Sequence, residues 1–422
     1  MADVQPLQTL RYDLRSVASL DAVIAPPYDV IDAERRASLV ARSPLNVVEL
    51  DLPEPTQAGG DPYLHATTTL EAWRQQGVLV REREPALWAL AQDFVAPDGS
   101  RRTRRGVFAR VRVEDYGPGR IRPHERTQPG PKEDRLRLTR ATRTNLSPIF
   151  SLFDDPAGEA WRALGPAAAE EPFVVATDDE GVENRLWRVG EAGVIEAVQG
   201  ALAERELLIA DGHHRYETAR LYAREIGGEG EHRYVLMFLC ALSDPGLAVF
   251  PTHRLLSGLR DPETQERLGA ALKRDFEVEQ VDRSEIEPPP DPDRVAFGYM
   301  DAHFRQAYRL TLRDPGIAAA ALPERSEAYR SLDTAVLEAL VLRGALGLSE
   351  HDIADQRGVG YAKSTVAALD AVESGAVDAG FFMRATPIEQ VRAVAAAGES
   401  MPPKSTFFYP KVPTGLVFNP LE

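Results

Sequence analysis

Residues 206–219 read ELLIADGHHRYETA, and this stretch carries the strongest local signal in the chain. A short apolar run ends at Ala210 and is followed by the acid Asp211 and by Gly212. From Tyr216 to Glu225 the apolar residues recur at helical spacing. The pattern therefore predicts a buried strand, a tight polar turn at residues 211–215 and a helix that starts at once.

The predicted turn has the chemistry of an anion site. Backbone N–H groups at the start of a helix, together with the helix dipole, favour negative charge. The side chains of His213, His214 and Arg215 add donors for phosphate oxygens. Asp211, at the end of the strand, is expected to hold a metal ion or to orient a substrate hydroxyl. The alternative interpretation is a capped helix start with solvated histidines.

The rest of the chain alternates between strand-like and helix-like segments, which indicates a mixed α/β or α+β fold. Strands are predicted at residues 86–94, 106–113, 172–177, 185–189, 206–210, 234–242, 247–251, 295–300, 306–312 and 379–384, followed by a strand-rich tail. Helices are predicted after Asp32 and at residues 64–76, 194–205, 262–276, 333–346, 363–374 and 387–397. Residues 120–145 show no strong helix or strand period. We expect three regions, 1–120, 121–330 and 331–422, although no linker marks their boundaries.

Composition excludes several classes of protein. Of 422 residues, 49 are Lys or Arg and 65 are Asp or Glu, so the net charge is −16. Such a chain is a poor candidate for binding nucleic acid or an anionic membrane surface. The single Cys240 rules out a disulfide within one chain and Cys-based metal sites. No apolar run approaches the roughly 20 residues of a membrane helix, and the first residues do not resemble a signal peptide. We therefore expect a cytoplasmic protein.

A second polar segment, RPHERTQPGPKEDR at residues 122–135, has the composition of a loop that presents catalytic groups. Glu125 is placed beside cations, so it could serve as a base while Lys132 and Arg135 hold phosphate. Composition alone supports a solvated charged loop equally well.

Three further segments carry weaker signals. SMPPKST at residues 400–406 could supply phosphate ligands from Lys404, Ser405 and Thr406. PTHR at residues 251–254 places two basic side chains at a predicted strand end, and APPYD at residues 25–29 predicts a rigid turn. Taken singly, each favours a structural turn over a site. The chain contains no Gly-x-Gly-x-x-Gly, no P-loop and no Gly-x-Ser-x-Gly motif.

Taken together, these motifs resemble a family of bacterial and archaeal proteins catalogued as domain of unknown function 1015. The resemblance runs from about residue 10 to the C-terminus. It rests on APPYDVI (25–31), PHERT (123–127), PK-x-DR (131–135), N-x-SPI (145–149), ADGHHRY (210–216) and MP-x-KST (401–406).

The Asp-Gly-His-His-Arg turn is also similar to the phosphate-binding turn of the ParB and sulfiredoxin superfamily, which includes free-serine kinases. This resemblance implies a ParB/sulfiredoxin-like core elaborated with further strands and helices. In those kinases a Pro-His-Glu segment precedes the turn and its Glu acts as the base. By resemblance, Glu125 is then the general base, Asp211 positions a hydroxyl or a metal ion, and residues 212–215 cradle phosphates.

These arguments predict a small-molecule kinase that transfers a phosphoryl group from ATP, ADP or pyrophosphate to a hydroxyl, with free L-serine as the favoured acceptor. Mg²⁺ is the predicted cofactor because it would bridge the donor phosphates. The alternatives are a phosphatase for small phosphate esters and a non-enzymatic nucleotide-binding regulator. The oligomeric state stays open, with a homodimer as one option.

The predicted residues fall into three sets. The catalytic set is Glu125, Asp211 and His214, with Asp211 also the predicted metal ligand. The phosphate-binding set is Gly212, His213, His214, Arg215, Lys132, Arg135, Lys404, Ser405 and Thr406. The substrate-binding set is Tyr28, His124, Thr127, His253 and Arg254.

Overall fold

The computed structural model describes residues 2–55, 59–291 and 293–422. The chain divides into two compact units. Unit 1 comprises Met1–Pro123, Thr127–Ala248 and Pro410–Glu422, and unit 2 comprises His124–Arg126 and Val249–Tyr409. The division differs from the three expected regions because the last residues of the chain belong to the same unit as the first ones.

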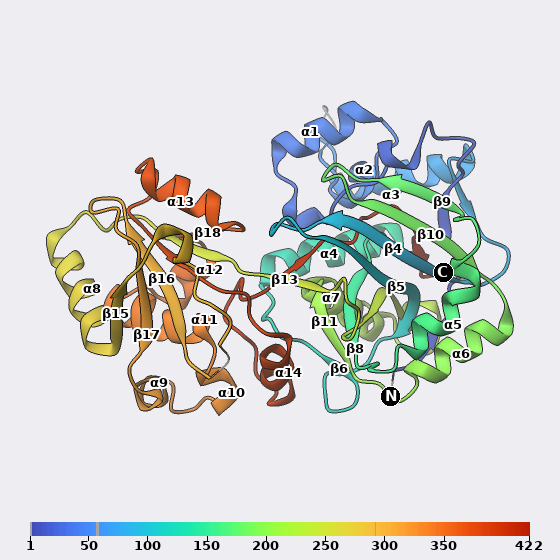
Figure 1. Ribbon diagram of the computed structural model, residues 1–422. Coiled ribbons are helices and arrows are strands. Elements are labelled where there is room, and N and C mark those ends of the chain that lie inside the picture. Colours follow the sequence, from blue (N-terminus) through green and yellow to red (C-terminus); the bar gives the residue numbers. More distant parts are fainter. Residues whose placement is uncertain (1, 56–58, 292) are drawn as a thin grey trace. The chain divides into compact units, whose positions relative to one another are not determined.

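Unit 1 is built on a sheet that has nine strands over the described residues (Figure 1). The order is β6-β11-β8-β12-β5-β4-β10-β9, and β1 pairs with β5. Neighbouring strands are antiparallel except for the pairs β12–β8 and β11–β6. The strands are β1 (Val4–Gln5), β4 (Leu87–Val95), β5 (Arg101–Arg112), β6 (Ile121–Arg122), β8 (Ile149–Phe153), β9 (Val174–Thr177), β10 (Glu183–Val189), β11 (Leu207–Asp211) and β12 (Tyr234–Ala241).

Helices and two small strand pairs complete unit 1. The helices are α1 (Ala33–Arg42), α2 (Val48–Asp51), α3 (Pro62–Gln75), α4 (Pro129–Thr142), α5 (Glu159–Ala168), α6 (Ala192–Leu202) and α7 (His213–Ile226), with 3-10 turns at Leu20–Ala22, Tyr28–Val30 and Glu231–Arg233. The strand pairs are β2 (Leu10–Tyr12) with β3 (Leu79–Arg81) and β7 (Thr144–Asn145) with β21 (Asn419–Pro420). Helix α4 packs against α7, and α5 packs against α6.

Local chemistry explains where these elements begin and end. Asp32 caps α1 by accepting a hydrogen bond from the N–H of Arg35, as the sequence predicts. Gly77 follows α3 with a φ of +71°, the left-handed conformation that a residue after a helix often needs. Gly106 lies under a neighbouring ring, since a Cβ there would come within 2.5 Å of Phe238. The side chains of β5 and β12 can therefore pack together only because residue 106 is a glycine.

Unit 2 contains a six-stranded antiparallel sheet in the order β15-β17-β16-β19-β14-β18 over the described residues. The strands are β14 (His253–Leu256), β15 (Phe276–Gln280), β16 (Ala296–Asp301), β17 (Tyr308–Leu312), β18 (Val359–Ala362) and β19 (Ala379–Phe382), and β13 (Ala248–Phe250) pairs with β20 (Phe407–Tyr409). The helices are α8 (Pro262–Asp275), α9 (Pro315–Ala321), α10 (Glu327–Arg330), α11 (Asp333–Val336), α12 (Glu350–Ala354), α13 (Thr365–Glu373) and α14 (Ile388–Ala396), with a 3-10 turn at Arg283–Glu285. A π-helix, Leu337–Ala345, continues directly from α11.

The fold is a mixed α/β architecture, as predicted, and the hairpin around Pro97–Gly99 joins β4 to β5 as expected. One prediction was wrong. The charged segment at residues 122–135 was expected to be a loop, but α4 begins within it at Pro129. Its helical period was hidden because the buried side chains of Leu136 and Leu138 share the helix with many charged residues.

Two other expectations need correction. His253 and Arg254 were expected at the end of a strand, but they begin β14 and are buried. The tail was expected to be rich in strands, yet beyond β20 only the two residues of β21 are assigned to a strand among residues 410–422. The tail is instead a largely irregular segment whose Val412, Val417 and Phe418 are buried.

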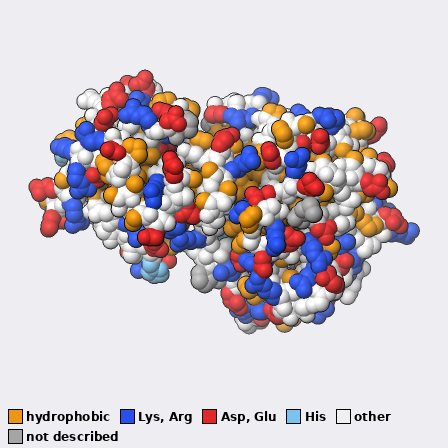
Figure 2. Space-filling model, turned by 90° about the horizontal axis from the view of Figure 1, so that it is seen from below, with side chains coloured by type: hydrophobic (Ala, Val, Ile, Leu, Met, Phe, Trp, Pro, Cys, Tyr) orange, Lys and Arg blue, Asp and Glu red, His pale blue; other side chains and the backbone are white. Residues whose placement is uncertain are grey.

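Two surface properties follow from the described residues. None of their helices is both long enough and apolar enough to cross a membrane. On the face in Figure 2, the side chains of Lys and Arg are interspersed with those of Asp and Glu. Both signs of charge therefore share this surface.

Candidate functional site

The strand–turn–helix predicted at residues 206–219 forms in unit 1. Asp211 is the last residue of β11, Gly212 follows with a φ of +93°, and α7 begins at His213. This conformation favours glycine, and a Cβ at position 212 would lie 3.0 Å from the guanidinium of Arg215 and would push that side chain aside. Gly212 has no side chain to cap the first turn of α7. The start of this helix therefore presents its backbone N–H groups without a side-chain cap.

Asp211 holds two cations, one on each carboxylate oxygen. Arg215 donates from Nη2 to Oδ2 at 2.6 Å, and Lys411 donates from Nζ to Oδ1. Burial by itself would raise the pKa of Asp211, but Lys411 and Arg215 outweigh it and hold that pKa well below its usual range. The carboxylate is therefore ionised at neutral pH.

Five buried guanidinium nitrogens of unit 1 have no hydrogen-bond acceptor among the described residues, and two of them belong to arginines that act on Asp211. These two are Nε of Arg215 and Nη1 of Arg104. A buried donor without an acceptor is costly, and a charged one more so. Both nitrogens would gain from the oxygen atoms of a bound anion.

Arg104 is a fully buried cation that no sequence motif indicated. Its guanidinium lies 4.5 Å from the ring centre of Phe150, which is the cross-strand partner of Asp211. Nε donates to Oε1 of Gln92 at 3.1 Å, and the charges of Asp244 and Asp211 offset only part of the cost of burying the guanidinium. Burial consequently lowers the pKa of Arg104 to about 10. The guanidinium remains protonated at neutral pH.

The two histidines of the turn have different surroundings. His213 is buried, and its charge acts on Asp211 when it is protonated. His214 is half-buried, and its Nε2 accepts a hydrogen bond from the backbone N–H of Gln128 at 2.9 Å. A ring nitrogen that accepts such a bond carries no proton. In this geometry His214 is therefore neutral and carries its proton on Nδ1.

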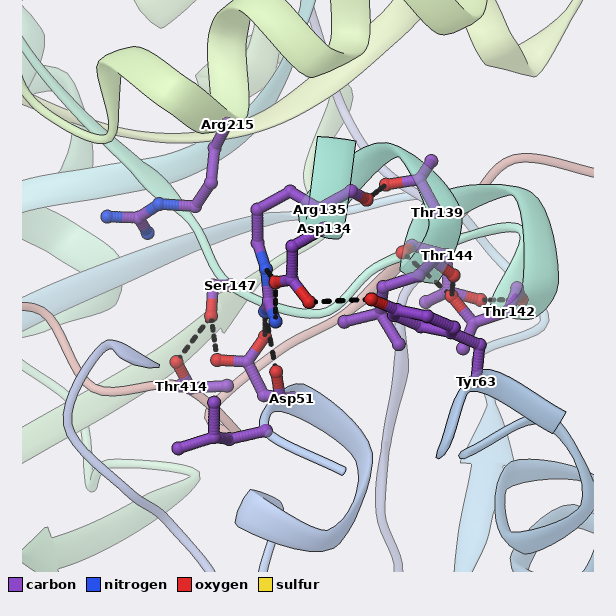
Figure 3. Close-up of polar contacts among 12 residues, drawn as sticks. Asp51, Tyr63, Asp134, Arg135, Thr139, Thr142, Thr144, Ser147, Arg215 and Thr414 are labelled. Carbon is purple, nitrogen blue, oxygen red and sulfur yellow. Dashed lines mark hydrogen bonds and ion pairs between the residues drawn. The ribbon is translucent and has the colours of Figure 1, made fainter. Parts of the chain in front are cut away.

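A polar cluster beside the turn joins several of the quoted motifs (Figure 3). Asp51 pairs with Nη1 of Arg135 at 3.3 Å and accepts a hydrogen bond from Ser147 Oγ at 2.8 Å. Ser147 Oγ lies 2.6 Å from Thr414 Oγ1 in the C-terminal segment. A cavity of about 40 Å³ is lined by Asp51, Arg135, Ser147 and Arg215, among others. This volume admits a few water molecules but not a nucleotide.

Tyr28 and Arg135 are in direct contact, with the guanidinium 4.1 Å from the ring centre. Burial raises the pKa of Tyr28 to about 12, although Arg215 and Arg135 oppose the rise. Arg135 also pairs with Asp134 at 2.6 Å, so two carboxylates already hold this predicted phosphate ligand.

Lys132 is half-buried in α4, and its carbonyl accepts a hydrogen bond from Thr218 of α7 at 3.4 Å. Thr127 is half-buried just before α4.

In unit 2, the Pro-His-Glu segment lies along residues 401–406. The carbonyl of His124 accepts a hydrogen bond from the N–H of Met401 at 2.7 Å, and Glu125 forms a parallel bridge with Met401. The ring of His124 is fully buried, with Nε2 at 2.9 Å from Thr406 Oγ1. The segment that carries Glu125 is thus fixed by backbone and side chain together.

The remaining predicted residues of unit 2 differ in exposure. Ser405 is buried, with its hydroxyl 2.7 Å from the carbonyl of Pro402 and 2.9 Å from Thr334 Oγ1. Lys404 is exposed and has a φ of +56°. His253 is fully buried, and its Nδ1 accepts from the N–H of Met383 at 3.0 Å. Burial lowers the pKa of His253 to about 4, so its ring is neutral.

The structure thus assigns the predicted residues to two sets, one in each unit. Unit 1 contains Tyr28, Thr127, Lys132, Arg135 and Asp211–Arg215, and unit 2 contains His124, Glu125, His253, Arg254 and Lys404–Thr406. Sequence reasoning missed Asp51, Arg104 and Lys411. It quoted Ser147 as part of a motif without giving it a role.

The predicted Mg²⁺ was tested against the residues present. Both carboxylate oxygens of Asp211 hold cationic side chains, and no group of three or more His, Cys, Asp or Glu suited to a metal ion occurs in the described part of the chain. These residues do not make up a metal site by themselves, so we derive no step through a metal ion. Mg²⁺ stays a prediction.

Comparison with solved structures finds remote likenesses. A conserved hypothetical protein from Pyrococcus furiosus is 16% identical, with 74% of this chain and 95% of that chain covered and a TM-score of 0.37. A free serine kinase variant in complex with ADP is 13% identical, with 74% and 92% covered and a TM-score of 0.38. SbnI with C-terminal truncation from Staphylococcus aureus is 10% identical, with 73% and 85% covered and a TM-score of 0.36. With TM-scores below 0.5, these likenesses carry no argument about activity.

Sequence comparison is more specific. No curated protein matches the chain. The family described as "Protein of unknown function (DUF1015)" matches residues 4–335, which is well over half of the chain and includes all the motifs of unit 1 up to α7. The chain belongs to this family.

Proposed function

We propose that the protein is a phosphotransferase whose phosphoryl donor binds in unit 1 at the turn Asp211–Arg215. The observation that carries the proposal is a pair of buried guanidinium nitrogens without acceptors, Arg104 Nη1 and Arg215 Nε, in the same unit as the uncapped start of α7. Helix N-termini and arginine forks are the groups with which proteins bind phosphate. The oxygens of a donor phosphate would supply the missing acceptors.

In this proposal Asp211 acts on the cations. Its carboxylate fixes Arg215 and Lys411 in place, so the binding of an anion needs little rearrangement of either side chain. Phosphoryl transfer depends mainly on such positioning and on neutralisation of charge. Asp211 is therefore a positioning residue for the donor site.

For the acceptor we propose a small alcohol, with free L-serine favoured, and for the general base we propose Glu125. These two assignments rest on the similarity of Pro123–Glu125 and Asp211–Arg215 to the segments of free-serine kinases described above. A carboxylate suits the role, because it can accept the hydroxyl proton as the bond to phosphorus forms.

Phosphorus NMR of the purified protein with L-serine and Mg²⁺, in parallel tubes with ATP, ADP and pyrophosphate, tests the proposal. We expect a phosphoserine signal in one tube, which also identifies the donor. Release of inorganic phosphate without phosphoserine would favour a phosphatase. Donor binding by calorimetry without any new phosphorus signal would favour a regulator, and both results would overturn the kinase.

A further inference from the structure

A second charged cluster lies entirely within unit 2 and includes none of the residues that the proposed function uses for the donor. Its centre is Arg254 on β14, which is only 3% exposed. Tyr361 is the cross-strand partner of Arg254 on β18, and the guanidinium lies 5.5 Å from the centre of its ring. Burying the charge of an arginine costs free energy, because the charge loses its water. A buried arginine on a sheet is therefore expected to have interactions or a role that offset this cost.

Residues 401–406 tie this arginine to Glu125. Nη2 of Arg254 donates to the carbonyl of Pro403 at 3.1 Å, and Glu125 is bridged to Met401, two residues earlier. The charge of Glu125 acts on Arg254 and on Tyr361. The backbone of this segment thus brings a carboxylate within electrostatic reach of the buried guanidinium.

The same segment also fixes a helix that carries a second carboxylate. Ser405 Oγ lies 2.9 Å from Thr334 Oγ1 on α11, and Glu338 follows four residues later on the adjoining π-helix. Residues four apart share a helix face. Glu338 accordingly acts electrostatically on both Arg254 and Tyr361. π-Helices are rare and occur frequently at functional sites.

Arg254 and Glu338 both retain binding capacity. Of the five N–H donors of the guanidinium, one on each Nη is bound, to the carbonyls of Thr252 and Pro403. Arg254 and Glu338 form no ion pair with each other among the described residues, and the carboxylate of Glu338 has no hydrogen-bond partner there. Burial raises the pKa of Glu338, although the charges of Arg254, Arg343 and Arg126 oppose the rise.

We propose that this cluster binds the acceptor as a zwitterion, a small α-amino acid with a hydroxyl side chain. Glu338 takes its ammonium group, Arg254 takes its carboxylate and Glu125 takes its hydroxyl. The inference rests on the proposed function for the identity of the acceptor. The chemistry is matched because a zwitterion supplies one charge of each sign to a guanidinium and a carboxylate that are not paired with each other. A neutral alcohol would satisfy neither.

The test measures L-serine binding by isothermal titration calorimetry without any donor present. Glu338→Gln keeps the shape of the side chain and removes its charge, so we expect affinity to fall about tenfold or more, the lower bound for one charged hydrogen bond. Glu324→Gln, an exposed carboxylate of the same unit, is the matched control and should bind like the wild type. Thermal melts of each variant show whether the fold is retained.

Ligand analogues separate the two charges. N-acetyl-L-serine lacks the ammonium charge and ethanolamine lacks the carboxylate, so both should bind the wild type more weakly than L-serine. Glu338→Gln should lose the preference for L-serine over N-acetyl-L-serine, and Arg254→Lys should lose part of the preference over ethanolamine. If Arg254→Lys does not fold, the comparison of L-serine with N-acetyl-L-serine in Glu338→Gln still tests the proposal.

The outcomes distinguish this inference from the proposed function. Phosphoserine formation with an unchanged KM for serine in Glu338→Gln would overturn the acceptor site and leave the kinase intact. Serine binding that depends on Glu338, without phosphoserine in any tube, would support the site and remove the kinase. Absence of serine binding to the wild type would overturn the inference outright.

Discussion

Lys411 donates to Oδ1 of Asp211 across 200 residues of chain, and the two side chains are both largely buried, at 17% and 15% exposure. Arg215 occupies the other oxygen of the same carboxylate. The turn at Asp211–Arg215 is therefore completed by a residue 200 positions later in the sequence.

Replacing Lys411 by Met should destabilise the protein in a way that depends on pH. Loss of one partner of a buried pair costs about 3–5 kcal/mol, although Arg215 remains and should keep the loss near the lower end. The pKa of Asp211 is lower in the folded protein than in the unfolded chain, where it is about 4. Ionisation of Asp211 therefore stabilises the fold fully above about pH 4, and this stabilisation is lost progressively as the pH falls below that value. Urea melts from pH 3 to pH 7 should show the wild type and variant converging in acid. A constant difference across this range would contradict the pairing.

Arg215→Ala should weaken donor binding by more than about 1.5 kcal/mol, the low end for a hydrogen bond to a charged group. Calorimetric titration with ATP, ADP and pyrophosphate measures the loss. Arg224→Ala on the last turn of the same helix is the control, because its exposed guanidinium pairs with Asp115 and should contribute little. Equal isotherms for Arg215→Ala and the wild type would remove Arg215 from the donor site.

Gly212→Ala should both strain the backbone and disturb the guanidinium of Arg215. The left-handed conformation costs a residue with a Cβ about 1 kcal/mol, and the new methyl group would lie 3.0 Å from that guanidinium. Gly99→Ala is a matched control, since Gly99 has a φ of +80° but no atom within 4 Å of its Cβ position. Urea melts should show a loss of stability in both variants, while only Gly212→Ala loses donor affinity. A donor isotherm that Gly212→Ala leaves unchanged would argue against binding at this turn.

Glu125→Gln should abolish most turnover and leave donor binding nearly unchanged, since the proposed base acts on the acceptor. Initial rates of phosphoserine formation and calorimetric donor titrations give the two quantities. Glu133→Gln removes an exposed carboxylate nearby in sequence and serves as the control. Full turnover in Glu125→Gln would exclude the base.

His253 should make stability depend on pH between about 4 and 6.5. Its folded pKa of about 4 lies below the unfolded value, so the unfolded chain binds more protons in this window and stability rises with pH across it. The total change is roughly 3 kcal/mol at 1.36 kcal/mol for each pKa unit. His253→Asn should flatten the slope in urea melts, whereas the exposed His351→Asn should leave it in place.

The sequence predicted the elements whose signal is local. The junction at Asp211–His213 was predictable because a strand, a glycine and a helix follow one another within a few residues. The hairpin at Pro97–Gly99 was predictable for the same reason. Helix α4 was not, because its buried side includes Arg135, whose burial depends on Asp51 more than 80 residues earlier.

The parts of the site that sequence reasoning missed are long-range. Arg104 lies in a run of four arginines at residues 101, 102, 104 and 105, and only its burial beneath Phe150 and Phe238 distinguishes it. Lys411 lies in none of the quoted motifs. Its pairing with Asp211 forms only when residues 410–422 fold back onto unit 1. Glu338 stands in an ordinary helical pattern, and its relation to Arg254 depends on how residues 401–406 pack.

The return of residues 410–422 to unit 1 has a consequence for how the chain folds during synthesis. Thr414 bridges to Ala25, β21 pairs with β7, and Lys411 completes the charge pair at Asp211. All of these contacts need the last residues to be made, whereas every strand of unit 2 precedes them on the ribosome. The proposed donor site therefore becomes complete only after residues 410–422 have left the ribosome and folded back onto unit 1.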